Sequence, residues 1–207
     1  MIITSVDALP VFVEISRVRE TLNAYCLAAD KVPVSLDDIE YAVVTEYGAV
    51  IEKKTLPFKS DLVRGLIRIW DPRGDEKLFA QTVIDSELNS AQTRFVQTKE
   101  LCHILLHCAE NCTADPTEII EYFVQDSTRV ANGDPETSDV KNESLADIAA
   151  YELLFPHDLR EPARDRIAAA TDTVFGVADW LDIPEHVVEM VISDRYIHFS
   201  NAVRALV

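Results

Sequence analysis

The strand-like segments of this 207-residue chain fall in one block, and that placement restricts the fold more than any other feature. Runs typical of strands cover 49–53, 65–70 and 77–85, and Asp-Pro-Arg-Gly at 71–74 predicts a turn that makes the last two runs a hairpin. Helical patterns precede and follow the block. As a hairpin, the last two runs of the block are expected to pair antiparallel.

The helical segments are recognised by apolar residues that recur every three or four positions. One such pattern covers 11–29, and a second helix is expected to begin after the N-cap Ser35 and to end at Gly48. A long third pattern covers 93–112. Further helices are expected at 143–154, 161–175 and 184–207.

The length of the chain favours one domain with a full hydrophobic core. We expect residues 1–30 to form an N-terminal helix or extension and 31–207 to form the main domain. The segment 126–142 is polar, contains Pro and Gly and has no periodicity, so it predicts an exposed loop.

The charge of the chain limits the partners that it can attract. The formal net charge is −17, and a count over 110–165 gives fourteen acidic and four basic residues. Such a surface repels phosphate backbones and anionic lipids. We therefore expect no nucleic-acid partner and no membrane partner.

The amino-terminal sequence and the cysteines indicate a compartment. Residues 1–20 lack the charged start, the apolar run and the cleavage site of a secretion signal, and no apolar stretch is long enough to span a bilayer. The four cysteines, at 26, 102, 108 and 112, do not form a disulfide framework in a chain of this length. We expect a cytoplasmic protein with reduced thiols.

The third helical pattern contains a near match to a zinc-binding motif. In a His-Glu-x-x-His helix, the two histidines project to one side and bind one zinc ion, while the glutamate serves as general base for a metal-bound water. Here the segment reads Lys99-Glu-Leu-Cys-His103, so lysine replaces the first histidine. Taken alone, such a string is typical of an ordinary helix surface.

The sequence around this motif makes the match specific. The segment TRFVQTKELCHILLH at 93–107 is similar, without a gap, to RRFTLAHELGHLLLH of the ImmA/IrrE family of metallopeptidases. Downstream, ESLADIAAYELLFP at 143–156 resembles the family pattern ExxANxFAAxLLMP, and 174–188 resembles its closing segment. Upstream, VPVSLDDI at 32–39 resembles the short helix before its strands. The resemblance covers roughly 30–195.

The resemblance implies an α+β fold in which a small, largely antiparallel sheet packs on helices. It also implies a zincin-like core, C-terminal helices and a cleft between two helices. It implies Glu100 as general base, His103 as second zinc ligand and Glu143 as third, while Lys99 stands at the position of the first ligand. It also implies a bacterial or phage origin. Family members are regulators that cleave or antagonise transcriptional repressors, often encoded beside a helix-turn-helix protein.

Lysine is a poor substitute for the missing histidine. An amine binds zinc only when neutral, and neutralising an amine with a pKa of about 10.4 at pH 7 costs roughly 4.6 kcal/mol. We therefore favour a lapsed metal site with no cofactor, and zinc only if the protein is active. Lys99 either points to solvent or, beside the carboxylates of Glu100 and Glu143, replaces zinc as the cation that ties the two helices together. His107, four residues after His103, is the alternative zinc ligand.

Three functions follow from these observations. The first is a non-catalytic ImmA/IrrE-like regulator that binds another protein, such as a helix-turn-helix repressor or a phage or mobile-element factor. The second is an active zinc endopeptidase with non-standard ligands. The third, which depends on composition alone, is an acidic decoy that imitates nucleic acid.

Overall fold

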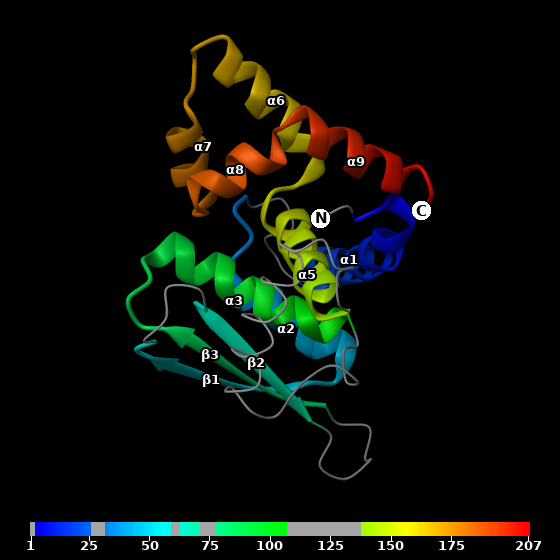
Figure 1. Ribbon diagram of the computed structural model, residues 1–207, viewed down its shortest axis with the longest axis vertical. Coiled ribbons are helices and arrows are strands. Elements are labelled where there is room, and N and C mark those ends of the chain that lie inside the picture. The colour runs from blue at the N-terminus through cyan, green and yellow to red at the C-terminus, as the bar shows by residue number, and fades with distance from the viewer. Residues whose placement is uncertain (1–2, 26–31, 59–62, 71–77, 107–137) are drawn as a thin grey trace, which may run out of the picture.

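The computed structural model describes residues 3–25, 32–58, 63–70, 78–106 and 138–207 (Figure 1). Within these ranges, eight helices accompany a three-stranded sheet that packs against them, so the predicted α+β class is confirmed. No helix in the described part of the chain combines the length and the apolar character needed to cross a bilayer. The zincin-like character of the core stays a prediction.

The sheet consists of β1 (Val50–Leu56), β2 (Gly65–Trp70) and β3 (Phe79–Asp85) in the order β1-β3-β2. β2 pairs antiparallel with β3, as the predicted hairpin requires. β1 pairs parallel with β3, with Val50 opposite Phe79, so the sheet is mixed and not largely antiparallel. After β1 the chain forms β2 at the opposite edge of the sheet and then β3 between them. Local sequence patterns do not specify this strand order.

The first two helices begin and end at recognisable capping residues. α1 (Ser5–Tyr25) starts before the predicted residue 11, because the hydroxyl of Thr4 accepts a hydrogen bond from the backbone N–H of Asp7 at 3.2 Å. α2 (Leu36–Tyr47) confirms both predicted ends. The hydroxyl of Ser35 accepts from the N–H of Asp38, and Gly48 has a left-handed backbone with φ of 61°.

α1 contributes to the main core of the molecule. Its buried apolar side chains lie on one stripe and belong to the same core cluster as the other helices: Ala8, Val11, Phe12, Ile15, Val18 and Leu22. This stripe packs against α2 and against two helices from the carboxyl-terminal part, α5 (Ser138–Leu154) and α9 (Asp194–Arg204).

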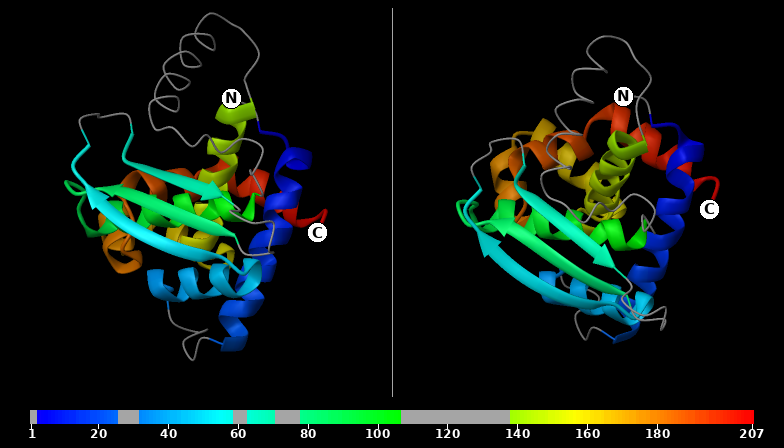
Figure 2. Two further views of the ribbon diagram at one scale, coloured as in Figure 1. Left: turned by 90° about the horizontal axis from the view of Figure 1, so that it is seen from below. Right: turned by 60° about the horizontal axis from the view of Figure 1, so that its bottom comes forward.

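α3 (Ser90–Leu105) lies at the centre of the fold, between the sheet, α2 and α5 (Figure 2). It starts at a capping box in which Asn89 accepts from the N–H of Gln92 and Gln92 accepts from the N–H of Asn89. All but the first turn is largely buried, including Arg94, Glu100 and His103. A helix buried on several sides must find partners for its charged residues inside the protein.

α5 corrects part of the predicted loop. The helix begins at Ser138, so 138–142 are helical and only 126–137 of the expected loop falls outside the described residues. Its end before Phe155-Pro156 agrees with the prediction. Three small residues, Ala146, Ala149 and Ala150, are fully buried on α5 and allow close approach to α1 and α3.

The last part of the chain is divided into more helices than predicted. α6 (His157–Ala168) begins before residue 161, and α7 (Val174–Leu181) is a separate helix capped by Thr173. The expected helix at 184–207 is two helices, α8 (Glu185–Val191) and α9. Ser193 separates them, because its hydroxyl donates to the carbonyl of Met190 and accepts from the N–H of Tyr196.

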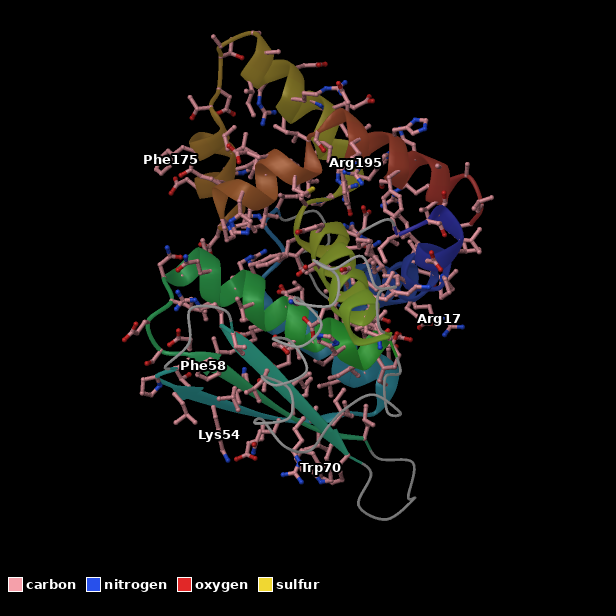
Figure 3. All side chains as sticks on the ribbon, viewed as in Figure 1. Arg17, Lys54, Phe58, Trp70, Phe175 and Arg195 are labelled. Carbon is pink, nitrogen blue, oxygen red and sulfur yellow. The ribbon has the colours of Figure 1, made fainter. Side chains whose placement is uncertain are left out.

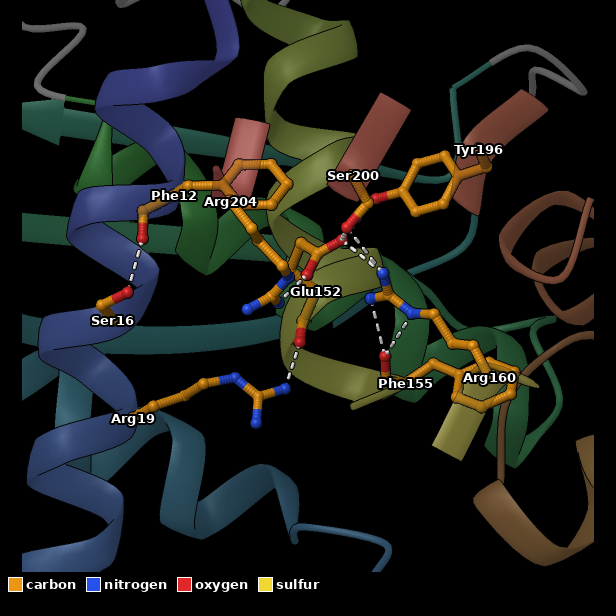
Figure 4. Close-up of polar contacts among 9 residues, drawn as sticks. All are labelled: Phe12, Ser16, Arg19, Glu152, Phe155, Arg160, Tyr196, Ser200 and Arg204. Carbon is orange, nitrogen blue, oxygen red and sulfur yellow. Dashed lines mark hydrogen bonds and ion pairs between the residues drawn. The ribbon is translucent and has the colours of Figure 1, made fainter. Parts of the chain in front are cut away.

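A buried carboxylate joins α5 to the carboxyl-terminal helices (Figure 4). Glu152 is fully buried, and its Oε1 accepts from Arg160 at 2.7 Å, Tyr196 at 3.0 Å and Ser200 at 3.1 Å. Its Oε2 accepts from Arg204. Burial would raise the pKa of Glu152, but the two arginines lower it below its ordinary value. The carboxylate is therefore ionised and holds α5, α6 and α9 in register.

We expect Glu152→Ala to lower the free energy of unfolding by about 3–5 kcal/mol at neutral pH, because it leaves the buried Arg160 guanidinium unpaired. Urea denaturation measures the loss. The loss should shrink as pH falls through the folded-state pKa of Glu152, where the wild-type carboxylate is also neutralised. Glu161→Ala, at an exposed glutamate of α6, is the control. Equal stability of the two variants would contradict the role given to Glu152.

Candidate functional site

The candidate site lies where α3 packs on α5. α3 supplies Lys99, Glu100 and His103, and α5 supplies Glu143 and Asp147. Residues four apart share a face of a helix, so Lys99 with His103, and Glu143 with Asp147, form two facing pairs. The structure therefore brings together the four residues that the sequence analysis identified, which are Lys99, Glu100, His103 and Glu143.

Ionic contacts connect the two helices directly. The Nζ atom of Lys99 lies 2.7 Å from Oε2 of Glu143 and 3.5 Å from Oδ1 of Asp147. The Nε2 atom of His103 lies 3.3 Å from Oε1 of the same Glu143. Both oxygens of Glu143 thus face a nitrogen from α3. Of the two expectations for Lys99, the structure shows the bridging ammonium and not the solvent-directed side chain.

The charges of this pair reinforce each other. Burial disfavours the charged amine, but the nearby carboxylates of Asp147, Glu143 and Glu100 outweigh it and hold the pKa of Lys99 above its ordinary value. Burial would also raise the pKa of Glu143, but His103 and Lys99 lower it to about 2. At neutral pH, Lys99 is a cation and Glu143 an anion, so Lys99 cannot act as an amine nucleophile.

Glu100 occupies a different environment, although it is next to Lys99 in sequence. Only 5% of its surface is exposed, and burial raises its pKa to about 7 against the attraction of His103 and Lys99. The start of β2 covers this side chain closely. A Cβ atom at Gly65 would lie 3.0 Å from Oε1 of Glu100 and 2.3 Å from a methyl carbon of Val96. Glycine at 65 is thus required by the close approach of β2 to α3.

Asp147 is the site residue that the sequence analysis missed. Burial raises the pKa of its carboxyl group, although Lys99 acts in the opposite direction. The signal that could have found it is its spacing of four residues from Glu143. A motif comparison alone could not, because Asp147 falls at a position that the family pattern fills with asparagine.

The residues present do not fit a zinc ion. A catalytic zinc site needs three protein ligands and an open position. Here the Lys99 ammonium lies against Glu143, and His103 and Glu143 are the only residues of the implied ligand set. In the described part of the chain, no three His, Cys, Asp or Glu side chains are grouped to hold a metal. His107, the alternative ligand, lies outside the described residues.

The described groups of the site have two chemical properties at neutral pH. The buried Glu100 carboxyl group can exchange a proton near neutral pH, and the Lys99 ammonium can hold an anion in place. Neither property by itself cleaves a peptide bond. The geometry therefore supports a structural ion pair between two helices.

Comparison of the chain with protein-family models and with curated proteins finds no match. The assignment of site residues therefore rests on the sequence motif and on the contacts described above.

Lys99→His should install zinc binding, because it recreates His-Glu-x-x-His on α3 while α5 still offers Glu143. A ligand at about a hundred times its Kd adds about 2.7 kcal/mol to the folded state. In a protein of this size, that corresponds to a rise in Tm of about 5–11 °C. Thermal unfolding with and without zinc measures it. Wild type should respond far less, and a response that survives addition of Glu143→Ala would contradict the proposed convergence of the two helices.

Glu100→Gln should change how stability depends on pH. A carboxyl group whose folded pKa is about 7, above its unfolded value near 4.3, favours the folded state fully below pH 4, and this contribution is lost as pH rises to 7. Glutamine carries no such penalty. Urea unfolding should therefore show the variant gaining on wild type between pH 4.5 and pH 7.5, whereas Glu87→Gln, at an exposed position, gains nothing. A gain that is independent of pH would contradict the assigned burial.

Proposed function

We propose that this protein is a non-catalytic relative of the ImmA/IrrE metallopeptidases that regulates another protein by binding it. One observation carries the proposal. The ammonium of Lys99 lies 2.7 Å from Glu143, the residue matched to the third zinc ligand, so a fixed positive charge stands beside the residue on which a metal would depend. An ammonium neutralises the carboxylate but cannot activate water as zinc does. The scaffold is kept and the hydrolytic chemistry is lost.

The ion pair between Lys99 and Glu143 also explains how α3 and α5 keep their arrangement without a metal. If zinc were simply removed from a site with Glu100, Glu143 and Asp147, three carboxyl groups would be left near one another without a cation. Lys99 supplies that cation from the chain itself. A protein whose function is binding needs the same helix arrangement without the metal, and this substitution supports such a protein.

The proposal extends to compartment and partner. We place the protein in the cytoplasm of a bacterium or of a phage-infected cell, which agrees with the free, buried thiol of Cys102. The proposed partner is a regulatory protein, such as a helix-turn-helix repressor, and not nucleic acid, because the net charge of −17 repels phosphate backbones.

Purified protein should contain well under one zinc per chain by elemental mass spectrometry, and it should not cleave β-casein with or without added zinc. The partner is then sought by cross-linking in the source cell, in parallel for wild type and Glu100→Gln. Because Glu100 is matched to the general base, a catalytic protein would release cut partner and its variant would retain intact partner. We expect the same intact partner from both. Stoichiometric zinc, or intact partner from the variant alone, would contradict the proposal.

A further inference from the structure

The hairpin formed by α7 and α8 presents an exposed face that no described residue covers. The two short helices are joined by the three residues 182–184 and lie on the side of α3 that faces away from the sheet (Figure 1). Their inward faces are apolar and buried. The outward residues are Phe175, Gly176, Asp179 and Trp180 on α7, and Glu185, His186, Glu189 and Met190 on α8.

Three large apolar side chains are exposed on this hairpin. Phe175 is 64% exposed, Trp180 42% and Met190 49%. The ring of Phe175 points away from the body of the protein (Figure 3). A soluble surface rarely carries several large apolar side chains within so short a segment, and such patches are typical of protein-binding surfaces. Aromatic residues and methionine are the types enriched there.

The charged residues of α7 and α8 themselves are all acidic, although Arg166 of α6 lies over the Trp180 ring. Asp179, Glu185 and Glu189 are exposed, and the sequence has no lysine or arginine from 167 to 193. None of these three carboxylates has a hydrogen-bond or ion-pair partner among the described residues. An apolar patch edged by unpaired carboxylates is complementary to a segment that carries apolar side chains and several Lys or Arg residues.

The chain itself provides an example of the contact expected from such a partner. The guanidinium of Arg166 lies 5.9 Å from the centroid of the Trp180 ring, and its Nε lies 3.3 Å from Oδ2 of Asp172. One arginine thus contacts an aromatic ring and a carboxylate together, the pairing that guanidinium groups favour. Arg166 already contacts the Trp180 ring, so the exposed Phe175 ring and the carboxylates of the outward face are what remain for an arginine of another protein.

We propose that the outward face of α7 and α8 binds a basic amphipathic segment of a partner protein. This inference rests on the proposed function for its premise that the protein acts by binding, and it names the surface and the chemistry of the partner. The surface lies outside the α3–α5 site. A pair of helices with a short turn can also place its second helix in a DNA groove. α8 has two exposed glutamates and no Lys or Arg, so the charge favours a protein segment over DNA.

The test uses the full chain and Trp180 as reporter. Trp70 and Trp180 are the only tryptophans of the sequence, and Trp70 lies on the sheet, far from Phe175 (Figure 3). In Trp70→Phe, emission therefore reports the hairpin alone. The probe is a synthetic Leu-Lys amphipathic peptide of about 18 residues, long enough to form a helix. Its binding should shift Trp180 emission to shorter wavelength, and the counterpart with Glu in place of Lys should not.

Two double variants of the α7–α8 hairpin separate the contribution of apolar contact to peptide binding from that of charge. Phe175→Ser with Met190→Ser removes apolar contact, and Glu185→Gln with Glu189→Gln removes charge at constant shape. Each pair should weaken the peptide affinity at least about tenfold, which corresponds to about 1.4 kcal/mol. The matched controls are Val6→Ser with Tyr41→Ser, and Glu20→Gln with Glu87→Gln, which change exposed residues elsewhere. They should leave the affinity within about twofold of wild type.

Several results would overturn the inference. Equal weakening by the control pairs would show general attraction to an acidic protein, and an unchanged Trp180 emission would place the peptide elsewhere. Tighter binding of a DNA duplex than of the peptide would assign the face to nucleic acid. These results leave the zinc content and the Glu100→Gln cross-linking result unaffected, so failure of this surface is distinguishable from failure of the proposed function.

Discussion

The burial of α3 on several sides is the constraint on which the rest of the structure depends. The sheet, α2 and α5 surround this helix, so its charged residues cannot all reach water. A buried charge needs a partner of opposite sign or becomes neutral. Lys99 meets the first requirement through Glu143 and Asp147, and Glu100 meets the second because its pKa of about 7 lets it take up a proton. The placement of α5 against α3 follows from the same pairing.

The same principle of a satisfied buried charge operates at a second point, where Glu152 joins α5 to α6 and α9. Among the ionic contacts of α5, that of Glu143 is directed to α3 and those of Glu152 are directed to the carboxyl-terminal helices. Removing Glu152 leaves the Arg160 guanidinium buried without its carboxylate, a costly state. α5 thus links the candidate site to α6 and α9.

Local signals in the sequence were sufficient for part of the fold. Ser35 and Gly48 bound α2 as predicted, because a cap is decided by neighbouring residues. The pairing of β1 was not predictable in the same way, because the sequence of a strand does not specify which strand it pairs with. β1 pairs parallel with β3, so the sheet is mixed. The division between α8 and α9 at Ser193 was missed because the apolar periodicity continues across it. The partners of Glu152 come from distant helices, and no local pattern indicates them.

The central claim is that Lys99 is a charged bridge between α3 and α5, and it is tested most directly by observing the lysine amino groups by nitrogen NMR while pH is raised. An ordinary lysine amine loses its proton near a pKa of about 10.4. Lys99 should remain charged beyond that point, since the carboxylates around it stabilise the ammonium. The Lys99 signal is identified by its loss in Lys99→Met. Loss of the Lys99 proton near the ordinary lysine pKa of about 10.4, or at lower pH, would contradict the account.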